Sequence, residues 1–310
     1  MAGRYGRTGG PRTGTFLWVF GIVSLITALS ALSLRPVPGR ETVGVPGPEP
    51  TLETFDRRSV GDGENGTSFV RWFAEGHDDA AWYRSDFDNV DHFMEVGWSP
   101  DNMAFHAGRL DLWLTNKPSE TNPYTSAEYQ KRGRYGFGRF EVVMRAAQGS
   151  GLVSSFFTHT DAYFDTPHDE IDFEILGKDT RKVYVNWFTN GESGAASWID
   201  LGFDAADAFH LYAFEWTPET IRWFVDGTLI YERPSDSLDV PVTPGRIIVN
   251  LWTGQPGQYD WHGEPGFAAA DRASYQCISY QSLSDIDHPQ CSDGWSRPDP
   301  PTGASLASTL

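Results

Sequence analysis

The stretch "TPHDEIDFEILG", residues 166–177, decides how the rest of the sequence is interpreted. Acidic and apolar residues alternate in it: the acids are Glu170, Asp172 and Glu174, and the apolar residues are Ile171, Phe173 and Ile175. In a β-strand, side chains two residues apart lie on the same face of the sheet. The alternation therefore predicts a strand with one apolar face and one face that carries three carboxyl groups.

Two of these carboxyl groups, four residues apart, have the chemistry of a glycosidase site. Their Cα atoms would lie roughly 13 Å apart at about 3.3 Å per residue. Side chains that lean together on a bent strand can approach the roughly 5 to 5.5 Å of a retaining enzyme. Close carboxyl groups raise at least one pKa, which is what a general acid needs. Two other interpretations stay open: the solvated face of an edge strand, and a calcium site.

The composition of the 310-residue chain favours an aromatic-rich β protein, because aromatic residues make up 14% of it and it contains 32 Gly and 20 Pro. A formal net charge of -18 would repel a phosphate backbone, so we expect no nucleic-acid partner. No GxxxxGK[ST] or GxGxxG loop and no metal-ligand spacing of Cys and His is present. Nucleotide cofactors and structural zinc are therefore not expected, and no cofactor is required.

Short apolar–polar runs separated by turn residues follow one another from Ser68 onward. They cover residues 109–116, 138–146, 152–160, 182–190, 209–217, 220–232 and 245–254. This spacing predicts an all-β sandwich. Asp226 and Gly227 form the Asp-Gly pair of a tight hairpin. We expect a catalytic domain over residues 68–282 and a tail over residues 283–310.

The N-terminal region predicts export. Arginines but no acids occur in residues 1–14, and an apolar run follows at residues 15–34. At about 20 residues this run can span a bilayer, so a cleaved signal peptide and an uncleaved membrane anchor both stay open. Either one places the chain after residue 34 outside the cytoplasm. Residues 35–67 are rich in Pro and Gly and resemble a linker.

The two cysteines of the chain are Cys277 and Cys291. In an oxidising compartment they can close a loop of about 15 residues, which stabilises a fold by roughly 3 kcal/mol in the chain-entropy model. The alternative is a pair of free thiols.

Neighbouring runs place amide and aromatic side chains on common strand faces. Alternation groups Asn186 with Phe188, Asn250 with Trp252, and Phe157 with His159. Amides beside aromatic rings can bind sugar hydroxyls and stack on pyranose rings. Each residue alone is also compatible with ordinary packing.

At this point the sequence resembles a known family. "DEIDFE" matches the ExDxE signature of glycoside hydrolase family 16, and "HDEIDFEILGKDT", "VNWFTNG", "LGFDA", "FHLYAFEWTPETIRWFVDG" and "TPGRIIVNLWTG" are similar to segments of the bacterial lichenases. "PHDEIDFE" also resembles related enzymes that cut succinoglycan-type exopolysaccharides. The similarity covers about residues 68–280. It implies a β-jelly-roll sandwich of two antiparallel sheets, with the glycan cleft on a concave sheet.

The resemblance also implies roles for individual residues. Glu170 would be the nucleophile, Glu174 the general acid/base, and Asp172 the carboxyl group that tunes both. The substrate-binding residues implied at the cleft are Glu128, Phe157, His159, His168, Asn186, Phe188, Asn250 and Trp252. Asp271 falls where some members of the family have a structural calcium ligand.

Departures from the lichenases affect the expected sugar specificity more than the chemistry. Lichenases carry aromatic residues where this chain has His159 and His168, Tyr where it has Phe188, and Arg where it has Gln130. The resemblance therefore implies a monomeric, exported endo-glycosidase. Its polysaccharide substrate would be a mixed-linkage β-glucan or a succinoglycan-like polymer. A transglycosylase and a non-catalytic glycan-binding module are the alternatives, since fold alone does not establish function.

Overall fold

The computed structural model describes residues 66–298 apart from residues 79, 91–92 and 268–269. The apolar run at residues 15–34 and the predicted linker up to residue 65 lie outside this part of the chain. Within the described residues, no helix is both long and apolar enough to cross a membrane.

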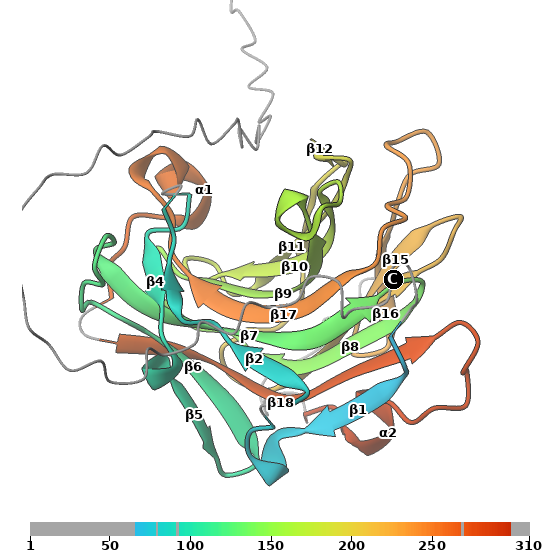
Figure 1. Cartoon of the computed structure of the whole chain (residues 1–310), viewed down its shortest axis with the longest axis horizontal. Helices are drawn as coiled ribbons and strands as arrows, with labels where there is room; N and C mark the ends of the chain where they lie inside the picture. Colours follow the sequence, from blue (N-terminus) through green and yellow to red (C-terminus); the bar gives the residue numbers. More distant parts are fainter. Residues whose placement is uncertain (1–65, 79, 91–92, 268–269, 299–310) are drawn as a thin grey trace, which may run out of the picture.

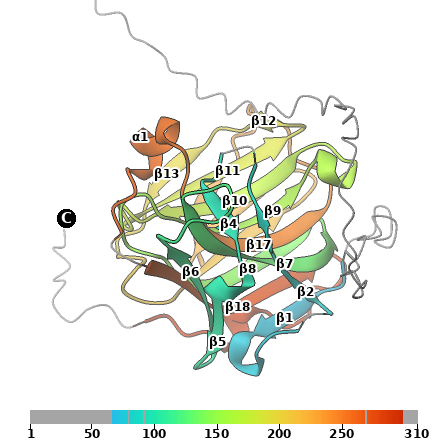
Figure 2. The same cartoon turned by 60° about the vertical axis from the view of Figure 1, so that its left-hand side comes forward.

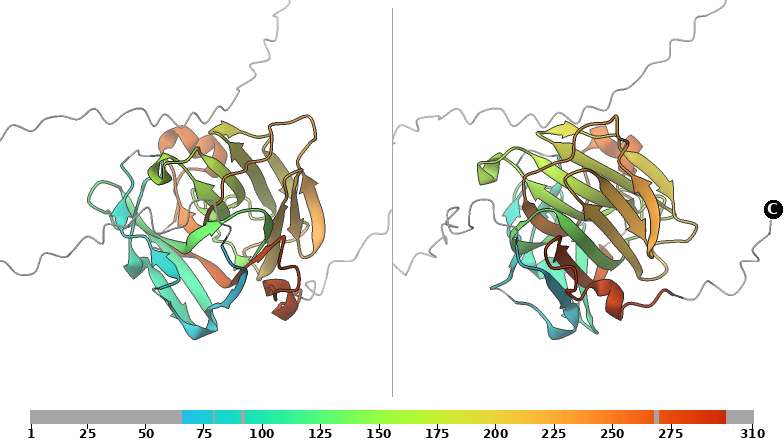
Figure 3. Two further views of the ribbon diagram at one scale, coloured as in Figure 1. Left: turned by 45° about the vertical axis from the view of Figure 1, so that its right-hand side comes forward. Right: turned by 90° about the vertical axis from the view of Figure 1, so that its right-hand side faces the viewer.

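The described chain forms two antiparallel sheets, which lie in two layers (Figures 1 and 3). The inner sheet has the strand order β2 (Trp82–Arg84), β7 (Tyr124–Tyr135), β17 (Gly245–Trp252), β9 (Val153–Thr160), β10 (Asp169–Leu176), β11 (Lys182–Thr189) and β13 (Ser197–Asp200), with β12 (Glu192–Ser193) also paired to β11. Figure 2 shows most of these strands side by side. The acidic strand β10 therefore lies inside a sheet and is not an edge strand.

The outer sheet is built around β18 (Ala270–Ser282), which pairs with β8 on one side and with β6 and β1 on the other. The strands of this sheet include β1 (Phe69–Trp72), β5 (Met103–His106), β6 (Arg109–Thr115), β8 (Gly138–Arg145), β14 (His210–Trp216), β15 (Ile221–Val225) and β16 (Thr228–Glu232). Asp226 and Gly227 join β15 to β16 with positive φ angles of 50° and 77°, as the Asp-Gly hairpin predicts. The seven strand regions expected from the sequence all form strands, and the all-β sandwich is confirmed.

The remaining elements of the described chain are short. β4 (Val96–Trp98) pairs with β3 and runs parallel to β7. The other short elements are β3 (Phe87–Asp88), the 3-10 turns Phe73–Glu75, Pro100–Asn102, Ala162–Phe164 and Pro256–Gln258, and the helices α1 (Tyr259–His262) and α2 (Cys291–Gly294).

The hydrophobic core lies between the sheets and includes the apolar face of β10. Ile171, Phe173 and Ile175 are fully buried. The ring of Phe173 packs edge-on against Tyr212 of β14, with ring centroids 5.7 Å apart. Burying one such side chain contributes about 1.5 to 3 kcal/mol. This burial forces the alternating acids onto the opposite face of the inner sheet, because adjacent side chains in a strand point to opposite sides.

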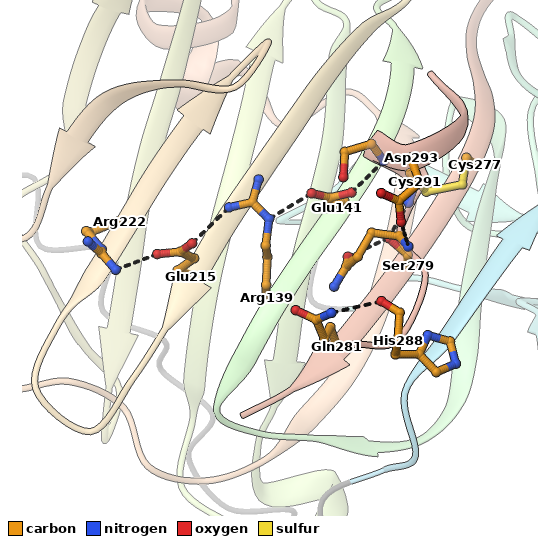
Figure 4. A network of polar contacts seen from close by, with 12 residues as sticks. Arg139, Glu141, Glu215, Arg222, Cys277, Ser279, Gln281, His288, Cys291 and Asp293 are labelled. Atoms are coloured by element: carbon orange, nitrogen blue, oxygen red, sulfur yellow. Dashed lines mark hydrogen bonds and ion pairs between the residues drawn. A yellow bond between two sulfur atoms is a disulfide. The ribbon is translucent and has the colours of Figure 1, made fainter. Parts of the chain in front are cut away.

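The C-terminal segment packs against the outer sheet and is held by the predicted disulfide between Cys277 and Cys291. Ser292 N–H donates a 2.8 Å hydrogen bond to Glu141 Oε2. Glu141 in turn joins a row of charged side chains with Arg139, Glu215 and Arg222 (Figure 4). The chain thus stays packed beyond residue 282, where the sequence analysis places the start of the tail, and the domain limits stay predictions.

Candidate active site

The cross-strand register of β10 places cleft residues beside each acid. Glu170 lies opposite His159 and Phe188, Asp172 opposite Phe157 and Asn186, and Glu174 opposite Ser155 and Tyr184. Residues directly opposite in a sheet share a face. The three acids therefore share one face with most of the cleft residues expected from the sequence.

This face is the concave side of the inner sheet, the side on which α1 lies in Figure 1. Trp261 of α1 packs against this face. Its ring centroid lies 5.6 Å from that of Tyr184 and 5.8 Å from that of Trp252. Tyr184 shares its row with Glu174. The acids thus open into the hollow side of the curved sheet.

Glu170 is surrounded by hydrogen-bond donors. Its Oε2 lies 2.6 Å from Nδ1 of His159 and 3.2 Å from Nε2 of His168. Burial alone would raise the pKa of Glu170, but the hydrogen bonds and positive charge of the two imidazoles outweigh burial and lower it to about 2. Glu170 is therefore a carboxylate at neutral pH, the form required of a nucleophile.

His159 is shared between two carboxylates. Its Nε2 lies 3.4 Å from Oδ2 of Asp161, while Nδ1 faces Glu170. Burial lowers the pKa of His159, yet the hydrogen bonds and charges of Asp161 and Glu170 outweigh burial and raise it to about 10. The ring is thus an imidazolium at neutral pH and donates from both nitrogens.

Glu174 has the opposite surroundings. Burial, followed by the nearby charge of Glu170, raises its pKa to about 8. Across β9 its neighbour is Ser155 and not a histidine. A carboxyl group that stays protonated at neutral pH can donate a proton to a leaving oxygen.

Asp172 lies between these two glutamates and is almost fully buried. Burial raises its pKa well above the usual value, and the charges of Glu174 and Glu170 raise it further. Its Oδ1 has no hydrogen-bond partner among the described residues. The protonated form of Asp172 is therefore favoured by burial and by the two glutamates on either side of it.

A buried polar network lines the same face on β7 and β17. Glu128 accepts hydrogen bonds from Ser85, Gln130 and Asn250 at 2.8, 2.7 and 3.2 Å. Gln130 also accepts one from Arg246 at 2.6 Å. These hydrogen bonds fix the side-chain amide of Asn250 in β17, which lies two strands away from β10.

Aromatic rings form one side of the site. Trp252 donates a hydrogen bond to Ser155 Oγ at 3.1 Å, and its ring stacks on Phe93. A hollow of about 350 Å³ lies beside these rings and is lined by Lys178, Trp198, Asp260 and Trp261. Flat rings next to polar groups are suited to binding sugar rings.

The structure brings the catalytic and substrate-binding residues predicted from the sequence together on one face of the inner sheet, and it places Asp271 elsewhere. His168 precedes β10 and stacks on Phe188, with ring centroids 4.7 Å apart. Asp271 lies in β18 of the outer sheet, opposite Leu114, so it does not line this face. Its calcium role stays a prediction.

Sequence reasoning missed Asp161, Arg246 and Trp261. Arg246 could have been found, because it lies four residues before Asn250 on the same strand face. Asp161 follows the last residue of β9 and Trp261 lies in α1, so alternation indicates nothing about either side chain.

Comparisons with known proteins agree with this geometry. Residues 90–274 match the sequence model of the family described as "Glycosyl hydrolases family 16". A β-glucanase of Acetivibrio thermocellus is 41% identical over 214 residues, which are 69% of this chain and 62% of that enzyme. The chain thus spans less than two thirds of that relative. A β-glucanase of Bacillus subtilis strain 168 is 36% identical over 230 residues, which are 74% of this chain and 92% of that enzyme.

Solved structures show the same fold. A prokaryotic β-1,3-1,4-glucanase (lichenase) from a mouse hindgut metagenome superposes with a TM-score of 0.66 at 38% identity, covering 70% of this chain and all of that one. The β-glucanase of Bacillus licheniformis gives a TM-score of 0.66 at 36% identity, covering 71% of this chain and all of that one. The family match, the similar β-glucanases and the shared fold agree with the ExDxE strand. The chain therefore belongs to the glycosyl hydrolases family 16.

Proposed function

We propose that the protein is a retaining endo-β-glucanase that hydrolyses internal bonds of a mixed-linkage β-1,3-1,4-glucan. The observation that carries this proposal is the strand β10, which presents Glu170, Asp172 and Glu174 on the concave face of the inner sheet. The similar proteins are named β-glucanases, and one solved structure is described as a β-1,3-1,4-glucanase. A succinoglycan-like polymer is the second substrate class, motivated by "PHDEIDFE".

In the first step, a carboxylate oxygen of Glu170 attacks the anomeric carbon of the bound sugar. Glu174 gives its proton to the departing glycosidic oxygen, so the bond between sugar and leaving group breaks as the glycosyl-enzyme ester forms. Asp172 lies between them, and burial and the charges of both glutamates raise its pKa, which disfavours a further negative charge beside the attacking oxygen.

In the second step, Glu174 acts as a base and takes a proton from water. The water oxygen then bonds to the anomeric carbon, and Glu170 leaves as a carboxylate. Two inversions give a product with retained configuration. The aromatic wall beside Trp252 and the amides of Asn186 and Asn250 would hold the glucan chain across the inner sheet.

Export of the protein belongs to the same proposal. The basic, then apolar, N-terminal sequence supports it, and so does the disulfide, because disulfides persist in oxidising compartments. An extracellular polymer is also accessible only to an exported enzyme. N-terminal sequencing of the exported protein distinguishes the two cases. A cleaved signal peptide removes residues 15–34, whereas a membrane anchor retains them.

Azide rescue tests the assigned roles. Glu170→Ala removes the nucleophile and leaves room for azide, which should restore turnover of an activated β-glucoside and give the α-glycosyl azide. Glu174→Ala keeps the nucleophile, so azide should intercept the intermediate and give the β-azide. Equal hydrolysis of lichenan by both variants and the parent would contradict the proposal. Product analysis with an added acceptor sugar separates hydrolysis from transglycosylation.

A further inference from the structure

The surroundings of Glu170 contain a group of ligands that the glycosidase mechanism does not require. His159, His168 and Glu170 each offer one ligand atom, and these three atoms lie within 4.8 Å of one another. In the described part of the chain, no other His, Cys, Asp or Glu residues form such a group of three. The sequence spacing did not predict this site, because His159 comes from β9, His168 directly precedes β10 and Glu170 lies near the start of β10.

The distances fit a small metal ion. Tetrahedral zinc has bonds of about 2.0 to 2.2 Å to nitrogen and oxygen, which places ligand atoms roughly 3.4 Å apart. The two imidazole nitrogens lie 2.6 and 3.2 Å from Glu170 Oε2. To reach the spacing of two zinc ligands, each of these nitrogens would therefore move away from Oε2 by less than about 1 Å.

Outer groups hold the ligands in place. The second nitrogen of His159 faces Asp161 at 3.4 Å, and metal-binding histidines almost always pair their other nitrogen with a carboxylate or carbonyl in this way. The ring of His168 stacks on Phe188 with an angle of 22° between the planes. Both imidazoles are thus oriented before any ion arrives.

We propose that His159, His168 and Glu170 form a binding site for a divalent transition metal such as Zn²⁺ or Cu²⁺, and that the ion inhibits the enzyme. Two imidazoles and one carboxylate suit these ions, whereas Ca²⁺ and Mg²⁺ prefer oxygen ligands. An ion on Oε2 occupies the lone pair that would attack the sugar and places a positive charge beside the anomeric carbon. The inhibition rests on the proposed function, but the binding does not.

Isothermal titration of the metal-free protein with ZnCl₂ tests the binding. The parent should bind one Zn²⁺ at this site. His168→Phe keeps a ring against Phe188 but removes a ligand, so we expect at least a tenfold loss of affinity. Asp161→Asn should lose about 10- to 100-fold, as outer partners typically do. His288→Gln removes a partly exposed histidine of the C-terminal segment and serves as the matched control, with unchanged affinity.

Lichenan hydrolysis with and without Zn²⁺ tests the consequence. The parent should lose activity at the Zn²⁺ concentrations that fill the site and recover it with EDTA. No binding by the parent, or equal binding by His168→Phe, would overturn the site. Zn²⁺ that binds at this site without inhibiting hydrolysis would overturn the inhibitory role. Inactivity of the metal-free parent on all glucans would instead count against the proposed function, and the titration would still decide the metal site.

Discussion

The protonation of Glu174 should set the upper pH limit of catalysis. With a pKa of about 8, about 90% of Glu174 is protonated at pH 7. A carboxyl group with the usual value of 4.5 would be about 0.3% protonated at that pH. Since proton donation requires the protonated form, kcat/KM should fall tenfold for each pH unit above about 8. The measurement is lichenan hydrolysis at low substrate concentration from pH 5 to 10, with EDTA present.

The cause of this pKa is tested by Glu170→Gln, which removes the neighbouring charge and leaves the burial of Glu174 in place. For carboxyl groups at the roughly 5.5 Å spacing of a retaining pair, Coulomb's law with an effective dielectric constant of about 20 gives about 3 kcal/mol. This energy equals about two pKa units, so the pKa of Glu174 should fall to about 6.

Carbon-13 NMR titration of glutamate-labelled protein measures this change, with Glu174→Gln identifying the signal. Glu219→Gln removes the same charge from an exposed turn between β14 and β15 and should leave the pKa of Glu174 unchanged. The reasoning is refuted if kcat/KM stays constant up to pH 9, or if Glu170→Gln and Glu219→Gln give the same pKa for Glu174.

Three further predictions concern tuning and stability. Asp172→Asn removes the carboxyl group that interacts with the charges of both glutamates and should lower kcat by about tenfold or more, while product NMR still shows retention; an inverted product would contradict its role. Replacing Cys277 and Cys291 by Ser opens a loop with a sequence separation of 14 and should cost about 3 kcal/mol, or about 6 to 12 °C in melting temperature; an unchanged melting curve would argue against it. A fragment of residues 66–298 should fold, and one of residues 66–282 should melt at a lower temperature because it lacks α2 and the disulfide; equal melting temperatures would show that the C-terminal segment adds no stability.

Strand alternation and the spacing of the apolar–polar runs predicted the all-β sandwich and one face of the site, whereas the concave cleft was implied by the family resemblance. Ile171, Phe173 and Ile175 are buried and their polar neighbours are not part of the core, because a strand between a core and a cleft obeys a strict period of two. The same rule correctly grouped Asn250 with Trp252. These predictions needed only local geometry, which each strand carries in its own sequence.

Alternation could not predict which residues meet across strands. His159 lies beside Glu170 only because β9 and β10 pair in the register that sets these two residues opposite each other. A shift of one residue would have put the neighbouring threonine there and turned the imidazole into the core. That register is decided by packing between the sheets, so neither the imidazolium nor the proposed metal ligands could be derived from spacing along the chain.

The two glutamates of β10 differ because of their neighbours and not because of their own strand. They have the same side chain, the same strand and the same face. The row of Glu170 supplies His159, which favours the charged carboxylate, whereas the row of Glu174 supplies Ser155 and Tyr184, which bring no positive charge. The pKa values of about 2 and about 8 follow from this difference. The imidazoles that keep Glu170 ionised also complete a set of metal ligands, so the arrangement that prepares the nucleophile would also expose it to inhibition by transition metals.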